Sequence, residues 1–219
     1  MFLPPAFRED RLEVQHALMR AHPFALLVTA GPAGLLANPL PFALYVEEGE
    51  EQGRRGVLRA HVSRANEVWR ELAAVGECLV VFQGPHHYIT PSWYASKAQT
   101  HKVVPTWNYA TVHAWGAPRV VHDAGWLLAL LHDLTQTQES GRAAPWRIAD
   151  APAAYIDTML KGIVGIEIPI ARCEGKWKVS QNRLEADRQG VVAGLAGEGE
   201  DGAAMAELVM RAMPANRIA

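Results

Sequence analysis

Short apolar runs that end at turn-forming residues dominate the first 120 residues, and they restrict the possible folds more than any other feature. Runs of this kind, rich in β-branched and aromatic residues and bounded by glycine, proline or polar clusters, are typical of strands. Pro105 and the segment 116–118 are expected to kink the longest run. The pattern predicts strands over residues 24–30, 35–46, 57–62, 78–83, 103–121 and 162–173.

Helices are expected between these strands, at residues 11–21, 65–75, 123–134 and 150–160, and the chain from residue 183 is expected to be helical in pieces. Apolar residues recur at helical spacing in 65–75, and Asp123 and Asp150 are placed to cap the two helices that follow them. Strands and helices do not alternate in a regular βαβ rhythm. The sequence therefore predicts a mostly β fold with peripheral helices, a largely antiparallel barrel with helices packed outside.

The composition sets limits on partners and location. The 219 residues are 49% hydrophobic and 20% charged, which permits a sizeable core. The formal net charge of −2 argues against a DNA-binding surface spread over the whole protein, although a local basic patch remains possible. No apolar run approaches the roughly 20 residues of a membrane span. We expect no membrane association. The N-terminus lacks a signal-peptide pattern, and Cys78 and Cys173 resemble free thiols, so a cytoplasmic location is expected.

Several well-known catalytic motifs are missing from the sequence. It contains no GxxxxGK[ST] loop, no GxGxxG after a strand, no HExxH and no GxSxG. His86 and His87 could suggest a metal site, but neighbouring strand residues point to opposite faces, and neither a carboxylate nor a cysteine stands at ligand spacing. We interpret them as loop histidines with structural hydrogen bonds. No residue is assigned as a catalytic nucleophile, acid or base, and no metal is expected.

The segment 61–66 (HVSRAN) is a candidate anion site. A strand is expected to end here and a helix to begin, with Ser63 as a possible cap. Amide groups at a helix start, together with the Arg64 guanidinium and the Asn66 amide, suit a phosphate monoester. The alternative is that Ser63 is only a cap and Arg64 only a solvated charge.

Three further segments combine aromatic rings with amide and cationic donors. Such a mixture suits a flat heteroaromatic ligand, because rings stack on it while amides bind its polar edges. The segments are 84–94 (GPHHYITPSWY), 104–109 (VPTWNY) and 174–183 (EGKWKVSQNR).

Taken together, these segments closely resemble the PaiB family, a group of FMN-binding negative transcriptional regulators of bacteria. The resemblance runs from the first residues to about residue 192. It is carried by the segments 36–42 (LANPLPF), 61–66 (HVSRAN), 82–85 (FQGP), 91–94 (PSWY), 104–109 (VPTWNY) and 175–182 (GKWKVSQN). It implies a split β-barrel similar to pyridoxamine-phosphate oxidases, and a homodimer that binds FMN at the subunit interface. It also implies an FMN-binding domain over residues 1–192, with a helical tail, 193–219, packed on or extending that domain.

The resemblance also implies a set of FMN-binding residues. The strand around Asn38 would lie beside the isoalloxazine ring, and the segment 61–66 would hold the phosphate and ribityl chain. A second group, which includes Trp107 and Lys176, would come from the partner subunit. The full expected set is Asn38, Pro39, Leu40, His61, Val62, Arg64, Ala65, Asn66, Trp107, Asn108, Lys176, Ser180 and Gln181.

Three functions remain open at this stage. The family resemblance favours a transcriptional regulator controlled by FMN, for which direct contact with nucleic acid is possible but not supported by the charge. The density of rings and lysines around residues 86–109 favours an FMN-dependent oxidoreductase or flavin reductase that acts on a small molecule. The third is a flavin-carrying or structural dimer without turnover.

Overall fold

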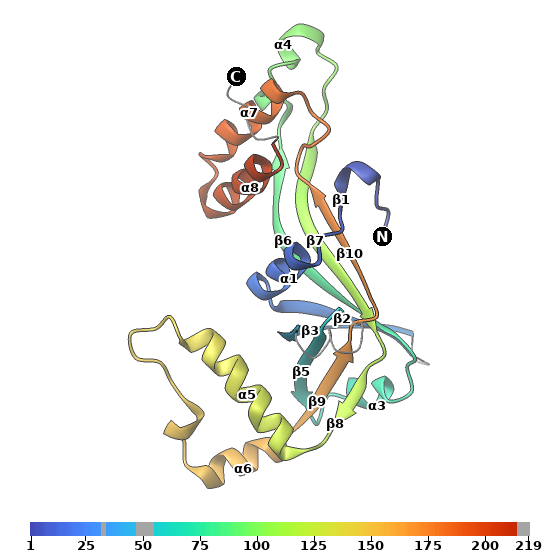
Figure 1. Cartoon of the computed structure of the whole chain (residues 1–219), viewed down its shortest axis with the longest axis vertical. Helices are drawn as coiled ribbons and strands as arrows, with labels where there is room; N and C mark the ends of the chain where they lie inside the picture. Colours follow the sequence, from blue (N-terminus) through green and yellow to red (C-terminus); the bar gives the residue numbers. More distant parts are fainter. Residues whose placement is uncertain (32–33, 47–54, 214–219) are drawn as a thin grey trace. The chain divides into compact units, whose positions relative to one another are not determined.

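The structure of the chain is a computed structural model that describes residues 1–31, 34–46 and 55–213. The chain forms two compact units, and each is assembled from segments that are distant in sequence. Figure 1 gives the labels of the helices and strands. The central unit comprises Met19–Phe82 and His113–Cys173, and the terminal unit comprises Met1–Leu18, Gln83–Val112 and Glu174–Ala219.

The strands form two sheets, with the orders β1-β10-β7-β6-β2-β3 and β4-β5-β9-β8. The pairings β1–β10, β2–β3, β2–β6, β4–β5, β5–β9 and β8–β9 are antiparallel, as predicted. The strands are β1 (Arg8–Glu9), β2 (Phe24–Gly31), β3 (Gly34–Pro41), β4 (Ala43–Tyr45), β5 (Val57–Ser63), β6 (Cys78–Ile89), β7 (Thr106–Gly116), β8 (Arg119–Val121), β9 (Ile163–Pro169) and β10 (Arg172–Lys178).

The helices lie outside the sheets, so the predicted mostly β fold with peripheral helices is confirmed. In the part of the chain that the structure describes, no helix is long and apolar enough to cross a bilayer. The α-helices are α1 (Leu12–Ala21), α3 (Val68–Leu72), α4 (Lys97–Thr100), α5 (Ala124–Glu139), α6 (Ala153–Lys161), α7 (Glu185–Leu195) and α8 (Gly199–Arg211), and the 3-10 turns are η1 (Pro5–Phe7), η2 (Pro91–Trp93) and η3 (Ile148–Asp150).

In the central unit, β5 pairs along its whole length with β9, from Val57 opposite Pro169 to Ser63 opposite Ile163. Leu58, Ala60 and Val62 are buried, as expected for alternate residues on the inner face of a sheet. The long pairing fixes the register, because a shift by one residue would turn this inner face toward solvent. His61 and Ser63 therefore lie on the opposite face of β5.

The β2–β3 hairpin has one buried and one open face. Ala25 and Leu27 are buried, whereas Phe24 is 68% exposed and Leu35 is 78% exposed. Because Phe24 pairs with Pro41, Leu26 with Pro39, Val28 with Ala37 and Ala30 with Leu35, the open face is apolar throughout. Residues 32–33 at the expected turn lie outside the described residues.

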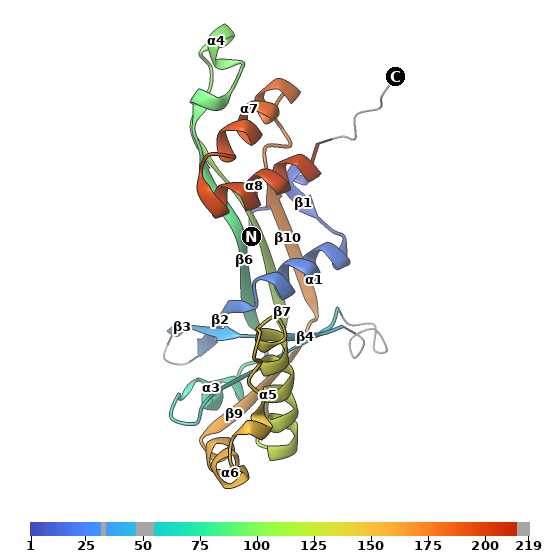
Figure 2. The same ribbon diagram turned by 90° about the vertical axis from the view of Figure 1, so that its left-hand side faces the viewer.

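In the terminal unit, α7 and α8 pack on one side of the strands β6, β7 and β10 (Figure 2). The buried core between them contains Ile89, Tyr94, Val179, Val191, Leu195, Met205, Ala206 and Val209. Two glycines allow α7 to lie against Trp93: a Cβ at Gly190 would lie 2.0 Å from the Trp93 carbonyl oxygen, and one at Gly194 would lie 2.3 Å from its ring. The predicted division after residue 192 stays a prediction; that residue lies within α7.

Two of the predicted helix starts are wrong in detail, and one is confirmed. The Asp123 carboxylate accepts a hydrogen bond from the Trp126 amide at 2.7 Å and caps α5, as predicted. Asp150 does not cap α6: it belongs to η3 and accepts from the Arg147 amide at 2.9 Å. α6 begins instead after Pro152, which has an extended backbone. The helix expected over 65–75 is shorter, because α3 covers only Val68–Leu72.

Three strand predictions also need correction. The run 35–46 was expected to be one strand, but it divides at Phe42 into β3 and β4, which belong to different sheets. The run 162–173 was expected to be one strand, but it divides into β9 and the start of β10, with residues 170–171 between them. The strand expected at 78–83 continues to Ile89. His86 and His87 therefore lie in a strand and not in a loop. Their Nδ1 atoms contact backbone carbonyls, at 3.3 Å from Gly84 and 2.7 Å from Tyr88.

The two cysteines are free, and both belong to the central unit. The Cys78 thiol donates to the Gly116 carbonyl at 3.4 Å. Burial raises the pKa of Cys78 to about 12 and that of Cys173 to about 12. A thiol with so high a pKa carries almost no thiolate near neutrality, so neither sulfur is an activated nucleophile.

Candidate functional site

A cavity of about 410 Å³ lies beside the end of β5 in the central unit, and we call it the β5 cleft. Its volume is within the range of small-molecule pockets. Four of the predicted cofactor residues line it: Leu40, His61, Val62 and Asn66. The remaining lining residues are Ser63, Met159, Gly162 and Ile163.

A hydrogen bond connects the two predicted cofactor-binding segments, the one around Asn38 and the segment 61–66. The Asn66 amide donates to the Asn38 side-chain oxygen at 3.1 Å. Asn38 lies on β3, directly before Pro39 and Leu40, and Asn66 follows β5. The expected isoalloxazine strand and the expected phosphate segment therefore meet, although they are far apart in sequence.

The turn after β5 differs from the prediction. Ser63 Oγ accepts from the Ala65 amide at 3.3 Å, and the Asn66 side chain accepts from the Val68 amide at 3.0 Å. Ser63 is thus the start of a turn and not a helix cap, since α3 begins only at Val68. Local side-chain bonds to backbone amides of this kind favour turns over helix. A five-residue helix offers no strong anion site of its own.

Arg64 is exposed and anchors this turn to the segment 161–163 of the same chain. Its Nε donates to the Lys161 carbonyl at 2.9 Å, and one Nη donates to the Ile163 carbonyl at 3.0 Å. The Trp69 indole donates to the Arg64 carbonyl at 3.0 Å. Because both bonds of the guanidinium go to neutral carbonyls, its positive charge is not neutralised by them, and its other Nη stays free to bind an anion.

His61 contributes a buried polar atom without a partner. Among the described residues, no group bonds to its Nδ1, which is inaccessible to solvent. Burial lowers the pKa of His61, so the ring is neutral near pH 7. Buried ring nitrogens nearly always have a hydrogen-bond partner.

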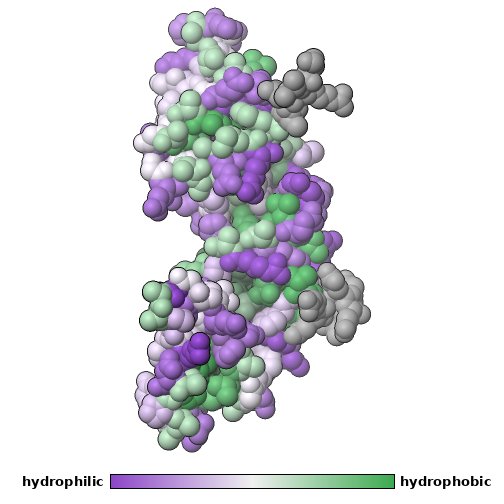
Figure 3. All heavy atoms as spheres, turned by 60° about the vertical axis from the view of Figure 1, so that its left-hand side comes forward, coloured by the Kyte–Doolittle hydropathy of each residue, from purple (hydrophilic) through white to green (hydrophobic). Residues whose placement is uncertain are grey.

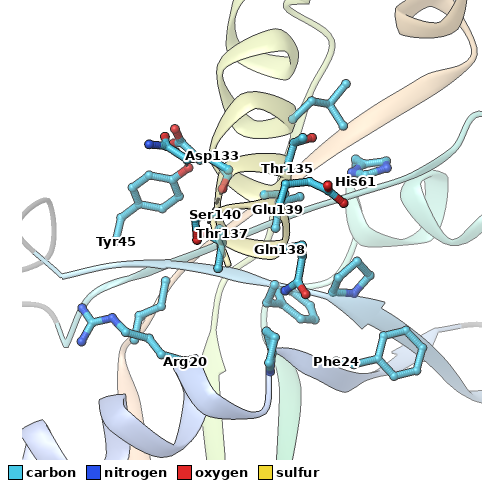
Figure 4. A pocket seen from close by; sticks show the side chains of 18 of the residues that line it. Arg20, Phe24, Tyr45, His61, Asp133, Thr135, Thr137, Gln138, Glu139 and Ser140 are labelled. Carbon is cyan, nitrogen blue, oxygen red and sulfur yellow. Dashed lines mark hydrogen bonds between the residues drawn. The ribbon is translucent and has the colours of Figure 1, made fainter. Parts of the chain in front are cut away.

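A second and larger cavity, of about 1060 Å³, also includes His61 in its wall (Figure 4). It lies between the end of β3, β4 and the second half of α5. The Tyr45 hydroxyl donates to the Asp133 carboxylate at 2.5 Å, and the Arg59 guanidinium lies 4.4 Å from the centre of the Tyr45 ring. Burial and this carboxylate raise the pKa of Tyr45 to about 12. We call this space the α5 cavity.

The sequence did not indicate the α5 cavity. Pro41, Phe42 and His61 of its lining belong to the segments 36–42 and 61–66, but most of the lining comes from β4 and the second half of α5, which contain no recognisable motif. The cavity forms only when β4 pairs with β5 and α5 packs beside them. The surface around α5 and α6 also exposes Leu128 and Met159. Figure 3 shows a hydrophobic area over this part of the molecule.

The remaining predicted residues lie together in the terminal unit. Asn108 is buried and donates to the Ser180 hydroxyl at 2.9 Å, while Ser180 itself has a left-handed backbone with φ 66°. Gln181 closes the same turn: its oxygen accepts from the Val179 amide at 2.8 Å, and its nitrogen donates to the Trp177 carbonyl. Asn108, Ser180 and Gln181 therefore hold the chain after β10 in place.

Trp107 and Lys176 have different surroundings from those three residues. Trp107 is 55% exposed, and Lys176 is buried with its Nζ donating to the Phe2 carbonyl at 2.9 Å. The predicted set is thus divided: the eight residues Asn38, Pro39, Leu40, His61, Val62, Arg64, Ala65 and Asn66 belong to the central unit, and the five residues Trp107, Asn108, Lys176, Ser180 and Gln181 belong to the terminal unit.

Comparison with known families identifies the chain. Residues 1–172 match the family model described as "Putative FMN-binding domain". The chain belongs to this family. It is also 30% identical to the protease synthase and sporulation protein PAI 2 of Bacillus subtilis, over 95% of this chain and 96% of that protein. An uncharacterised protein of Emericella nidulans is 33% identical over 92% of each chain.

The fold of this FMN-binding domain has relatives among solved structures. The FAD- and heme-binding protein of Mycobacterium smegmatis superposes with a TM-score of 0.57 at 17% identity, over 78% of this chain and 73% of that one. The predicted membership of the PaiB family and the split-barrel class are confirmed, with the qualification that the two sheets do not close into a complete barrel. FMN, the cofactor predicted from the sequence, is also the cofactor that the family description names.

The residues of the β5 cleft fit FMN. The cleft offers polar side chains at Ser63 and Asn66 for a polar edge and apolar side chains at Leu40 and Val62 for a ring system. Arg64 does not line the cleft, but it stands between the lining residues Ser63 and Asn66 and carries a cation for a phosphate. This combination of one cation, one polar acceptor or donor and an apolar wall is what a phosphorylated aromatic cofactor requires.

Proposed function

We propose that this FMN-binding protein is an FMN-dependent oxidoreductase that holds the cofactor in the β5 cleft and a small-molecule substrate in the α5 cavity. The observation that carries the proposal is the position of His61, which lines both spaces. A flavin reaction needs its second reactant beside the ring, and two cavities with one shared wall residue supply that arrangement. Bound FMN would supply one- and two-electron redox chemistry.

Each residue of the proposed cofactor site has a distinct role. Arg64 binds the phosphate. Ala65 follows it in the same turn, where its backbone amide donates to the Ser63 hydroxyl at 3.3 Å. Asn38 and Asn66 form the polar bridge under the ribityl chain, and Leu40 and Val62 form the apolar wall, whereas Pro39 faces the open side of the β2–β3 hairpin. His61 lies where the two spaces meet, at the edge shared by cofactor and substrate.

We propose further that two copies of the chain form a homodimer through the open face of the β2–β3 hairpin. This face contains only apolar side chains and lies at the edge of its sheet, where β3 has a free side. Large exposed apolar faces of this kind are rare on monomeric proteins and are typical of interfaces. Trp107 and Lys176 of the second copy would then complete the cofactor site, with Asn108, Ser180 and Gln181 supporting them.

The substrate is expected to be a small polar aromatic molecule. Phe24, Phe42 and Trp146 give the α5 cavity apolar walls, and α5 contributes hydroxyl and amide groups from Thr135, Gln136, Thr137 and Gln138. The carboxylate of Asp133 is already bonded to Tyr45, and Glu139 is paired with Arg142 at 3.0 Å. Arg20 also lines the cavity, which therefore offers hydrogen bonds together with one cation.

The experiment is a flavin titration followed by anaerobic reduction. Purified protein should bind FMN and quench its fluorescence, and Asn66→Ala should bind it at least several-fold more weakly than wild type, because the polar bridge to Asn38 is lost. The exposed Asn182→Ala is the matched control and should bind normally. Under anaerobic conditions NADH or NADPH should bleach the bound flavin. A protein that refuses FMN, or a flavin that neither nucleotide bleaches, contradicts the proposal.

A regulatory role is the second candidate, and the similarity to PAI 2 of Bacillus subtilis, described as a protease synthase and sporulation protein, favours it. With a formal net charge of −2, direct DNA contact would need a local basic patch. Gel-shift assays at physiological salt separate the two candidates. Promoter DNA that binds no better than random DNA excludes the direct form.

A further inference from the structure

A third cavity, of about 480 Å³, lies in the central unit between the second half of α5 and the segment 145–149 around η3. We call it the α5–η3 pocket. Its volume is within the range of small-molecule sites. None of the expected cofactor residues lines it, so the flavin site does not account for it.

A common wall lies between this pocket and the α5 cavity. Five residues line both spaces: Thr135, Gln136, Glu139, Ser140 and Trp146. Figure 4 labels Thr135, Glu139 and Ser140 of this wall. The Glu139 carboxylate accepts from the Trp146 amide at 3.0 Å and pairs with the Arg142 guanidinium at 3.0 Å. These two contacts fix the backbone of Trp146 against the end of α5, so the wall has a defined position.

The pocket presents one cation that no acid neutralises. Within the described residues no carboxylate pairs with the Arg147 guanidinium, whereas Glu139, the one carboxylate among the lining residues, has both oxygens engaged. Asp133 and Asp150 adjoin lining residues in sequence but do not line the pocket. The first accepts from the Tyr45 hydroxyl, and the second accepts from the Arg147 backbone amide. The guanidinium is therefore available to anionic oxygens, which it can bind through two N–H groups at once.

The rest of the pocket combines an apolar surface with polar groups. Proline, isoleucine and alanine side chains of the segment 145–149 supply the apolar part, and Trp146, which is 47% exposed, adds an aromatic ring. α5 adds the polar side chains of His132, Thr135 and Gln136. An apolar wall with a few polar groups is typical of small-molecule sites, and a half-exposed indole suits stacking against a flat ring.

We propose that the α5–η3 pocket is a second small-molecule site, which binds a flat aromatic ring that carries a carboxylate. The ring would lie against Trp146 and the apolar side chains of the segment 145–149, and the carboxylate would bind the Arg147 guanidinium. A single guanidinium matches the one negative charge and the two oxygens of a carboxylate. Binding at this site does not rest on the proposed flavin function.

The test uses indole-3-acetate as the probe and the uncharged indole-3-acetamide, of the same shape, as its control. Isothermal titration calorimetry gives the dissociation constants of both probes for wild type and each variant, with and without FMN. Arg147→Gln removes the cation, and Arg147→Lys keeps the charge without the paired N–H groups. Ala149→Phe fills the pocket from a residue that does not line the α5 cavity.

Arg20→Gln is the matched control, because it removes an exposed arginine that lines the α5 cavity and not this pocket. Circular dichroism checks that each variant is folded.

Wild type should bind indole-3-acetate more tightly than the amide. Arg147→Gln should weaken binding of the acetate about 5-fold or more, as for a lost hydrogen bond to a charged group, and should remove the preference over the amide. Arg147→Lys should recover part of the affinity. Ala149→Phe should weaken binding of both probes, and Arg20→Gln should bind them as wild type does.

Three outcomes overturn the inference. In the first, wild type binds the acetate no better than the amide. In the second, folded Arg147→Gln and Ala149→Phe bind the acetate as wild type does. In the third, affinity falls in Arg20→Gln and not in Arg147→Gln, which would place the carboxylate in the α5 cavity. Arg147-dependent binding by a protein that refuses FMN would support the pocket and contradict the flavin function, so the two proposals fail separately.

Discussion

His61 has a lowered pKa and no hydrogen-bond partner for its Nδ1, and both properties follow from its burial at the wall between two cavities. The folded protein resists protonation of this ring, whereas the unfolded chain accepts a proton below about pH 6.5. The free energy of unfolding should therefore decrease as the pH falls below this value. Above this pH the ring is neutral in both states, and His61 should not change the free energy of unfolding.

In His61→Gln this part of the pH dependence should disappear. Urea unfolding at pH 7.5 and pH 5.5 should give a smaller loss of stability for the variant than for wild type. His22, whose pKa is also lowered by burial, should retain its own contribution. Equal losses in both proteins would mean that His61 titrates alike when folded and unfolded.

Arg64 should matter for both cofactor affinity and local order. Arg64→Ala is expected to weaken FMN binding by about 1.5–3 kcal/mol, the value of a hydrogen bond to a charged group. It also removes two bonds to the carbonyls of Lys161 and Ile163. Flavin titration measures the first effect. Arg70→Ala removes an exposed pair with Glu67 and a contact of the guanidinium with the Trp69 ring; it is the control and should bind FMN as wild type does.

At this scale the sequence predicted types of residue better than their contacts. Asp123 was correctly predicted as a cap because its partner, the Trp126 amide, is three residues away. Ser63 and Asp150 are residue types that cap helices equally well, but their side chains accept hydrogen bonds within turns instead. The meeting of Asn38 with Asn66 depends on strand pairing across 28 residues, which no local pattern reveals.

Among the elements, α7 depends on two glycines that would be poor choices for an isolated helix. Alanine at Gly190 or Gly194 would raise helix propensity by up to about 1 kcal/mol. It would also place a Cβ 2.0–2.3 Å from Trp93, a contact that must displace the helix. We expect both variants to be destabilised by about 1–3 kcal/mol or more, as in other overpacked cores.

Gly197→Ala is the control for this prediction, because its nearest contact would be an ordinary 3.8 Å. Thermal or urea unfolding should place this variant near wild type and the other two well below it. Wild-type stability in Gly190→Ala would show that α7 does not pack tightly on Trp93.

Elements were predicted well where apolar residues alternate or cluster. Strands β2 and β5 and helix α5 lie close to their expected ranges. β6 was predicted too short because its second half carries polar and aromatic residues, whose exposure is a property of the open sheet face and not of a loop. The break between β9 and β10 at residues 170–171 contains neither glycine nor proline, so its position could not be read locally.

For the whole molecule, the proposed dimer has a direct test. Leu35→Glu places a charge on the open face of β2–β3 and should convert a dimer of twice 24.0 kDa into a monomer. Leu184→Glu changes an equally exposed leucine, 70% exposed in the terminal unit, and should remain dimeric. Light scattering after size-exclusion chromatography measures both masses. A monomeric wild type, or an unaffected Leu35→Glu, removes this face from the interface.

The family and its cofactor could be predicted from the sequence because the motif segments of the family occur in this chain in the family's order. The α5 cavity could not, since most of its wall comes from β4 and α5, which carry no motif. The division of the expected cofactor residues between two units was likewise invisible in the sequence. Strand pairing places them, and pairing depends on the whole fold.

The buried Cys78 thiol has a practical consequence for studying this protein. It belongs to the central unit, is only 3% exposed and is protonated in the native state, so a thiol reagent can modify it only after that unit opens. The rate at which Cys78 is alkylated therefore reports opening of the central unit, without any introduced label. Added FMN should slow the alkylation, whereas opening of the terminal unit alone should leave the alkylation rate unchanged.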